Sequence, residues 1–459
     1  MNYSFFSGHR PFKVGMGGLL VVASLQVALA ADFLEVYRLA QSSDQTFAAA
    51  RETLAALEQR LPQARAALLP SIVGYSNETR MQTSTSFNSA EPLGRNVRTW
   101  DWTLKLIQPV FRAQHYFAYT EAESIVEQAV ANFAQAEQDL ILRSAQAYFD
   151  VVVAEESILV AEAKLKAMGE QLAIASRGFE LGTATVTDVH ESRARVDLAR
   201  AERVAARNEL LAKRAELDKV VGEAPRTLSA LQARVVAPRP QPDDEQAWVD
   251  QARENNPGVR AGRAAYAAAE STVNKNRSDH LPTLDFTSSL GRNYSSANYA
   301  IPTDYTTLGR TAVTGLQLTI PIFTGGGTNA RVTEAIANRR KALADLEAAR
   351  RQVATDARQA FAAIANGLAQ IEALTSAVES GVVAVKGNQI GYRVGIRINV
   401  DVLNAEQQLY ASKRDLTKVR YETLLQGLKL KAAAGVLGEE DVLAINALLG
   451  PRGAEKVPD

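Results

Sequence analysis

The chain of 459 residues contains no cysteine and only four histidines. Without cysteine it has no disulfide bond, no thiolate metal site and no lipid-modified cysteine at a mature N-terminus. Three of the histidines, His115, His190 and His280, lie far apart in the sequence, and their spacing is not typical of a metal site. We therefore expect no metal and no other cofactor, and we assign each of these histidines to the surface.

Signatures of catalysis and of nucleotide binding are also missing. The glycines of "TGGGTNAR", residues 324–331, are not accompanied by the lysine of a phosphate-binding loop. We interpret this segment as the entry from a strand into a helix. No Ser, His and Asp residues cluster in the sequence, so we expect that the protein is not an enzyme. The 51 basic residues balance the 51 acidic ones, which gives no electrostatic reason to expect nucleic acid as a partner.

Long apolar runs are scarce, and the one such stretch lies at residues 14–30. It follows Arg10 and Lys13 and ends in Ala28-Leu29-Ala30. This arrangement is typical of a secretory signal peptide, so we expect residues 1–30 to be removed on export. A retained membrane anchor is disfavoured because the apolar core is shorter than the ~20 residues that a membrane span needs. Removal leaves 51 − 2 = 49 basic residues against 51 acidic ones.

The remaining sequence contains an internal repeat. Leu104 corresponds to Leu316 at a spacing of 316 − 104 = 212 residues, and Gly182 corresponds to Gly395 at 395 − 182 = 213 residues. A period this long indicates a duplicated domain rather than a solenoid. We therefore divide the chain into a signal peptide (1–30), a first repeat (31–221), a linker (222–245), a second repeat (246–435) and a loosely packed C-terminal tail (436–459).

Each repeat has the same predicted order of elements. A helix of about 30 residues precedes a hairpin of two strands, and a very long helical stretch, broken once, follows it. The first helix is expected to end before Pro70 or Pro282, because the residue before a proline disfavours the α region. Apolar residues spaced by three, four and seven in the long stretches predict coiled-coil-like packing, and residues 328–375 alone would form a rod of about 70 Å. The strands are predicted near 71–80, 98–109, 283–293 and 311–322, with polar loops at 82–96 and 292–309.

The predicted strands are amphipathic. Their alternation, their length of about ten residues and the tryptophans near one end are typical of an outer-membrane β-barrel, although a half-buried sheet of a soluble protein would alternate in the same way. Four strands cannot close a barrel, and open edges are not tolerated in lipid, so several chains must share one barrel. The residues predicted to face lipid are Trp100, Trp102, Leu104, Leu106, Leu316, Leu318 and Ile320.

The duplicated plan resembles the TolC family of outer-membrane export channels over essentially the whole mature chain. The resemblance is carried by the junctions "IQPVF" and "TIPIF" and by the turns "ELGTATVTDVHESRA" and "YRVGIRINVDVLNAEQQLYASKRDL". It implies a mostly α-helical fold with a small β part, in a homotrimer with a shared 12-strand barrel and a helical tunnel through the periplasm of a Gram-negative bacterium. It also implies a passive exit channel that joins a periplasmic adaptor and an inner-membrane transporter, such as an ABC or proton-driven pump.

The same resemblance assigns roles to the two turns. Tyr392 and Arg397 are similar to the pair that closes the tunnel by bonding to Asp188 and Thr187, and Asp401 to the acid of a constriction ring. Asn404 stands where the best-known member of the family has a second acid, so we expect a constriction with a single acid ring to bind cations less tightly. By composition alone, Arg397 and Asp188 would be an ordinary solvated pair at a helix end. The turns expected to dock the adaptor are Leu181, Gly182, Thr183, Val394, Gly395 and Ile396.

The sequence leaves two kinds of cargo open: proteins, such as a toxin, carried by type I secretion, and small toxic compounds removed by efflux. The lack of a lipid-anchor cysteine and the second turn motif favour protein secretion. A different class of function is also compatible with the pattern: a non-conducting trimeric coiled-coil protein, structural or adhesive, anchored in the outer membrane. A soluble periplasmic scaffold is a third interpretation.

Overall fold

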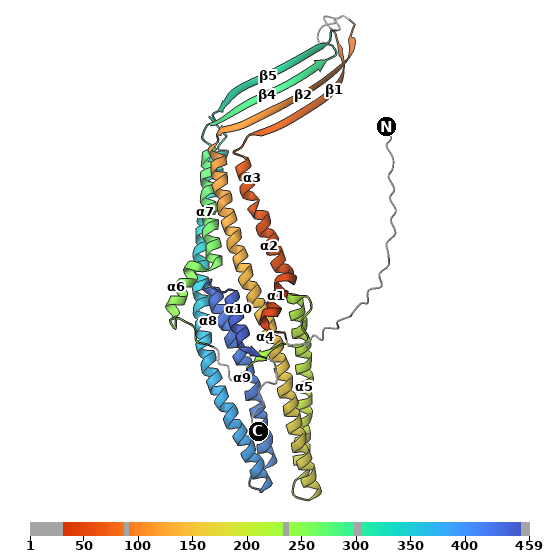
Figure 1. Ribbon diagram of the computed structural model, residues 1–459, viewed down its shortest axis with the longest axis vertical. Helices are drawn as coiled ribbons and strands as arrows, with labels where there is room; N and C mark the ends of the chain where they lie inside the picture. The colour runs from red at the N-terminus through yellow and green to blue at the C-terminus, as the bar shows by residue number, and fades with distance from the viewer. Residues whose placement is uncertain (1–30, 87–90, 233–237, 298–304, 451–459) are drawn as a thin grey trace, which may run out of the picture.

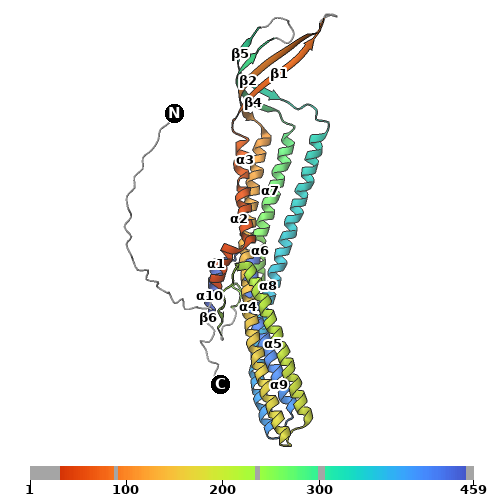
Figure 2. The same ribbon diagram turned by 90° about the vertical axis from the view of Figure 1, so that its right-hand side faces the viewer.

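The computed structural model describes residues 31–86, 91–232, 238–297 and 305–450. The predicted signal peptide, residues 1–30, lies outside the described residues. The chain is elongated, with a β-sheet at one end and long helices that run from the sheet to the opposite end (Figures 1 and 2). This mostly helical architecture with a small sheet confirms the predicted fold class.

The sheet contains β1 (Ser71–Thr85), β2 (Leu93–Phe111), β4 (Thr283–Ser295) and β5 (Thr307–Thr319) in the order β1-β2-β4-β5, with antiparallel neighbours. Both hairpins extend into the segments predicted as polar loops. The hydrogen bonds between strands join backbone groups, so polar side chains do not interrupt the pairing. β5 stops before Pro321, which has no N–H to donate.

The helix expected before each hairpin is not continuous. In the first repeat it divides into α1 (Phe33–Ser43), α2 (Gln45–Glu58) and α3 (Arg60–Ala66). The break at Asp44 has a local cause, since its carboxylate accepts the Phe47 N–H at 2.7 Å and so caps α2. In the second repeat α6 (Glu245–Asn255) and α7 (Pro257–Ser278) are separated by Asn256, which caps α7 and precedes Pro257.

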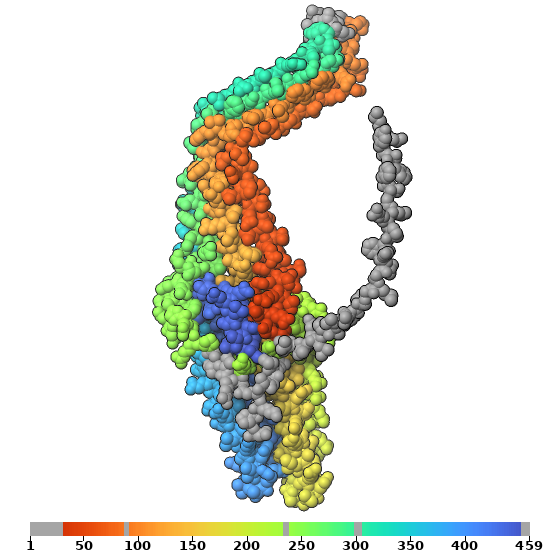
Figure 3. Space-filling view, in the orientation of Figure 1, coloured from red at the N-terminus to blue at the C-terminus, as the bar shows by residue number. Residues whose placement is uncertain are grey.

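Two pairs of helices form the long part of the molecule. α4 (Ala113–Glu180) has 68 residues and α8 (Gly327–Arg393) has 67, so each is about 100 Å long. Each reverses through a short turn into a shorter helix, α5 (Val186–Val221) or α9 (Asn399–Ala433). The α4/α5 and α8/α9 hairpins end side by side as two separate lobes at the end farthest from the sheet (Figure 3).

The middle of the molecule corrects one prediction. Residues 436–450, expected to belong to a loose tail, form α10 (Glu439–Ala447) and the short strand β6 (Leu449–Gly450), which pairs with β3 (Ala230–Leu231) inside the predicted linker. Apolar side chains cause this folding, because Val442, Ile445 and Leu449 are buried in the main core and burial of such side chains stabilises the fold. Residues 451–459 lie outside the described part of the chain.

The α8 helix contains a stretch that is long and apolar enough to cross a membrane, judged by length and composition only. Little of this stretch is buried in the single chain, with 11% of its residues buried. The apolar stripe of a coiled-coil helix is left uncovered in this way when the helices that pack against it are not present.

Candidate functional site

The two helix-reversing turns have the same backbone construction. In the first, the carbonyl of Gly178 accepts the N–H groups of Thr183 and Ala184 at 2.7 and 3.1 Å, and in the second the carbonyl of Gly391 accepts those of Ile396 and Arg397 at 2.9 and 3.2 Å. A glycine with positive φ completes each turn, at 73° for Gly182 and 79° for Gly395, a conformation that side chains disfavour.

The predicted docking turns lie together at the free end of the molecule (Figure 1). Their apolar side chains point largely into solvent: Leu181 is 80% exposed, Ile396 78% and Val394 64%. Exposed apolar side chains at a shared end are typical of a surface that a partner covers.

The Asp188 side chain forms hydrogen bonds at the start of its own helix. Its carboxylate accepts the N–H of Thr185 at 2.9 Å and the Thr185 hydroxyl at 2.8 Å, while the Asp188 N–H donates to that hydroxyl at 3.2 Å. This reciprocal capping box begins α5. Thr187, the next predicted gate residue, lies one position before Asp188 and is exposed.

The structure brings Tyr392 near Asp188, but it does not bring Arg397 there. Burial raises the pKa of the Tyr392 phenol, and the negative charge of Asp188 raises it further. Arg397 instead forms an ion pair with Asp401 at 3.6 Å, one turn along α9. Both side chains of this pair are substantially exposed, so its contribution is that of a surface pair, about 0–1 kcal/mol.

A buried asparagine that the sequence analysis missed joins the two hairpins. Asn399, 1% exposed, accepts a hydrogen bond from the Gln171 amide of α4 at 2.7 Å. Its own amide donates to the Ser192 hydroxyl of α5 at 2.8 Å and to the Asp188 carbonyl at 3.3 Å. One side chain thereby connects three helices. Its only sequence signal is an asparagine between two apolar residues in "INVDVL".

A second connection lies on the surface, one turn farther along. Arg195 of α5 donates to the Asn404 side-chain oxygen at 3.0 Å and also to Gln407. Asn404, which we predicted as part of the constriction, is therefore held from the other hairpin. Close to these polar connections in the sequence, Leu403 packs with Met168, Val196 and Ala199 in a small apolar cluster.

A buried carboxylate follows on α9. Glu406 is 3% exposed, and one of its oxygens accepts the Gln389 amide of α8 at 3.1 Å. The other oxygen has no hydrogen-bond partner among the described residues. Burial raises the pKa of Glu406, the hydrogen bond from Gln389 lowers it, and the charge of Glu170 raises it.

The strand register places the residues predicted to face lipid on one face of the sheet. Leu104 pairs with Leu290, which pairs with Ala312, and Leu316 pairs with Phe286; directly paired residues of antiparallel strands project to the same side. Trp100 stacks on Tyr294 with ring centroids 5.9 Å apart. Ile320 lies just beyond β5 and is exposed. The other predicted residues on this face are Trp102, Leu106 and Leu318.

The base of the sheet is tied to the helices. Arg112, directly before α4, donates to both carboxylate oxygens of Asp285 in β4 at 2.8 and 2.6 Å. Such a two-point pair fixes orientation as well as distance. The helical hairpins are thereby attached to the sheet through a defined joint.

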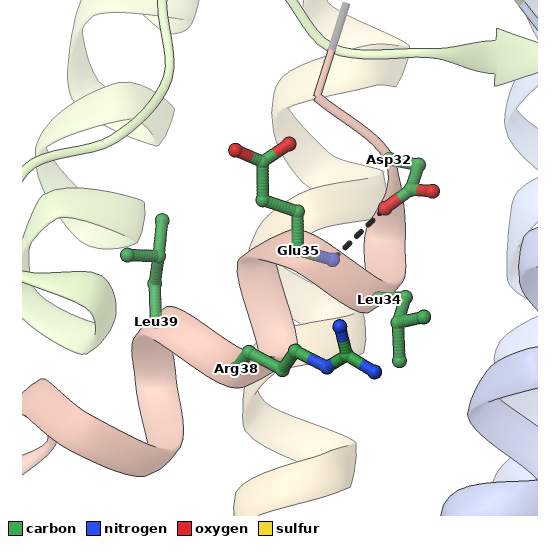
Figure 4. A pocket seen from close by; sticks show the side chains of 5 residues that line it. All are labelled: Asp32, Leu34, Glu35, Arg38 and Leu39. Atoms are coloured by element: carbon green, nitrogen blue, oxygen red, sulfur yellow. Dashed lines mark hydrogen bonds between the residues drawn. The ribbon is translucent and has the colours of Figure 1, made fainter.

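A surface hollow of about 400 Å³ lies beside α1, lined by Asp32, Leu34, Glu35, Arg38 and Leu39 (Figure 4). Its Asp32 carboxylate accepts the Glu35 N–H at 2.9 Å and so caps α1. This carboxylate therefore serves the helix, and we assign no chemistry to the hollow.

Comparison with known proteins identifies the family. The sequence profile of the outer membrane efflux protein family matches twice, at residues 36–223 and 248–436. The chain is 31% identical to the alkaline protease secretion protein AprF of Pseudomonas aeruginosa, over 97% of this chain and 94% of that one. It is 30% identical to the outer membrane protein TolC of Escherichia coli, over 94% and 88%. The structure of the Campylobacter jejuni CmeC outer membrane channel superimposes with a TM-score of 0.77 at 16% identity, covering 97% of each chain.

These similarities confirm the resemblance to the TolC family and place the protein in the outer membrane of a Gram-negative bacterium, with a large periplasmic part. The relatives are channels for secretion and efflux rather than enzymes. The chain belongs to the outer membrane efflux protein family.

Proposed function

We propose that three copies of this chain form a passive exit duct across the outer membrane. In one chain the sheet ends at β1 and β5, whose outer edges pair with no other described strand. Unpaired strand edges in lipid leave backbone groups without partners, at several kcal/mol each. Three chains with four strands each give 3 × 4 = 12 strands, a number within the range of closed bacterial barrels.

The helical hairpins continue the barrel as a tunnel, with the entrance at the turns. Closure of the entrance depends on the contacts that hold the α8/α9 hairpin against the α4/α5 hairpin. We therefore add Asn399 and Arg195 to the predicted gate residues, which are Thr187, Asp188, Tyr392 and Arg397. The predicted contact of Arg397 with Asp188 and Thr187 needs a neighbouring chain, because within one chain Arg397 pairs with Asp401.

The constriction carries little net negative charge. A ring of three Asp401 carboxylates would attract cations, but each has an Arg397 guanidinium at 3.6 Å. Asn404 adds no charge and is held by Arg195. Weak block by cations follows from both features.

The exposed apolar turns support docking of a periplasmic adaptor, which would couple the duct to an inner-membrane transporter that supplies the energy. Protein cargo, carried by type I secretion, is favoured over small toxic compounds by the similarity to AprF, whose name assigns it to alkaline protease secretion. The duct itself needs no enzymatic activity for this role.

The observation that carries this proposal is an amphipathic sheet with two open edges, continuous with hairpins about 100 Å long. Single-channel conductance of the purified mature chain in a planar bilayer tests it, with Arg397→Ser and Asp188→Ala as gate variants. We expect a small, stable wild-type current that rises in both variants. If intact trimers of wild type and of both variants pass no current, the duct proposal is wrong and a non-conducting protein anchored in the outer membrane remains.

A further inference from the structure

Two arginines face each other across neighbouring strands near the outer end of the sheet. Arg292 of β4 pairs with Arg310 of β5, and Arg292 also pairs with Trp102 of β2 on its other side. Because directly paired residues project to one side, all three lie on the face that carries Leu104 and Leu316. This arginine pair therefore belongs to the membrane-facing surface.

The pair lacks a negative partner. Like charges directly opposite in a sheet destabilise it, yet neither arginine forms an ion pair with any described residue. An anion from outside the chain would offset this repulsion between the two guanidinium groups.

The other hairpin shows how the repulsion within such a pair is reduced by a residue of the chain itself. Arg80 of β1 pairs directly with Arg98 of β2, on the same face of the sheet. Here Glu78 lies between them, 2.9 Å from Arg98 and 3.5 Å from Arg80. Glu78 is the one acidic residue on this face of the four strands, so the Arg292–Arg310 pair has no equivalent.

The position of the pair matches the level of lipid headgroups. Arg292 lies 292 − 284 = 8 residues beyond Leu284, near the start of β4, or about 26 Å along the strand. With the usual strand tilt this is a height of about 20 Å, close to the edge of an apolar band about 25 Å tall. Trp100 and Tyr294, one row farther out, are aromatic residues typical of that interface.

We propose that Arg292 and Arg310 bind the phosphate of a lipid in the outer leaflet, with Trp102 packing beside its apolar part. Guanidinium groups bind phosphate through paired, charge-assisted hydrogen bonds. The hairpin ends lie opposite the periplasmic helices, so this surface contacts the outer leaflet, whose glycolipid carries phosphate groups on its lipid A. The site depends on membrane location and not on conduction.

The test measures lipid A bound to the purified full-length trimer by native mass spectrometry. Wild type is compared with Arg310→Gln, Arg292→Gln and the double variant, and with Lys105→Gln as the control. Lys105 has the same charge and lies in the same sheet, but it projects from the opposite face. We expect binding to fall roughly fivefold for each arginine removed and to be unchanged in the control.

A second arm needs no variant and so remains decisive if the substitutions impair folding. Wild-type protein is offered lipid A and the same lipid after enzymatic removal of its phosphates, with and without excess inorganic phosphate. Preference for the phosphorylated lipid, undiminished by inorganic phosphate, supports the proposal. Equal binding of the two lipids, displacement by inorganic phosphate alone, or a double variant that binds like wild type would overturn it.

Discussion

The two turns have the same backbone but start their second helices differently. In the first repeat Thr185 and Asp188 form a capping box that holds the start of α5 with its own residues. In the second repeat Ile398 occupies the corresponding position and provides no side-chain cap. The polar residue beside it, Asn399, bonds instead to Gln171, Ser192 and the Asp188 carbonyl. The start of α5 is therefore stabilised by residues of its own hairpin, whereas the start of α9 is stabilised by contacts with the other hairpin.

This difference suggests which hairpin moves. An element held by a few specific contacts to a neighbour has two discrete arrangements, with the contacts made or broken. The α8/α9 hairpin fits this description, because its free end is attached through Asn399 and Arg195. Sequence substitutions at these contacts should shift the balance between a closed and an open entrance.

The largest effect is expected from Asn399→Leu. This change removes three hydrogen bonds and leaves the buried Gln171 and Ser192 groups without Asn399 as a partner, each at about 1–3 kcal/mol. We expect the closed state to lose most of its population and single-channel conductance to rise severalfold. Asn329→Leu, an exposed position at the other end of α8, is the matched control. Unchanged conductance in Asn399→Leu would show that this contact does not hold the entrance closed.

A smaller opening effect is expected from Arg195→Ala. The variant removes the surface connection to Asn404 and Gln407, worth about 1 kcal/mol, or roughly a fivefold change in the ratio of closed to open channels. The measurement is the open fraction in single-channel recordings. Arg200→Ala serves as the control, because Arg200 pairs with Asp197 on its own helix. Equal open fractions in the two variants would contradict the account.

We expect the buried Glu406 to make the stability of the folded protein depend on pH, and Glu406→Gln to abolish this contribution. Its pKa is raised by burial above the ordinary value of 4.5, so the folded hairpin binds a proton more tightly than the unfolded chain. Stability therefore rises as pH falls through the raised folded pKa, and levels off below the ordinary value. Thermal unfolding of wild type, Glu406→Gln and the exposed control Glu372→Gln across this range checks the sign. Stability that instead falls in this window, equally in all three, would contradict it.

The smallest effects on conduction should come from exchanging the caps, because these changes act within one helical turn. Thr185→Ala removes the capping box and Ile398→Thr offers one to α9, changes worth about 1 kcal/mol in opposite directions. Hydrogen exchange of the first-turn amides of α5 and α9 reports each locally. We expect faster exchange in the first variant and slower exchange in the second. If Ile398→Thr leaves α9 exchange unchanged, then the missing cap is not what distinguishes the two turns.

The sequence predicts the repeat, the four strands and the positions of both turns, because each depends on local patterns. Three such patterns are alternation over ten residues, a glycine after a helix and a proline before a strand. Each determines the structure of residues only a few positions away in the sequence. Asn399 could not be recognised in this way, since Gln171 and Ser192 lie 228 and 207 positions away in the chain. The folded segment at 436–450 was missed for the same reason, as its β6 strand pairs with β3 across more than two hundred residues.

The most direct test of the central claim is a reversible lock between the two hairpins. The chain has no cysteine, so Ser192→Cys with Asn399→Cys introduces the only thiols. In wild type the Asn399 Nδ2 and the Ser192 Oγ lie 2.8 Å apart. In the Arg397→Ser background, expected to be open, we predict that oxidation reduces the single-channel current to near the wild-type level and that a reductant restores it. A fully cross-linked trimer that conducts as well as its reduced form would contradict an entrance gated by separation of α8/α9 from α4/α5.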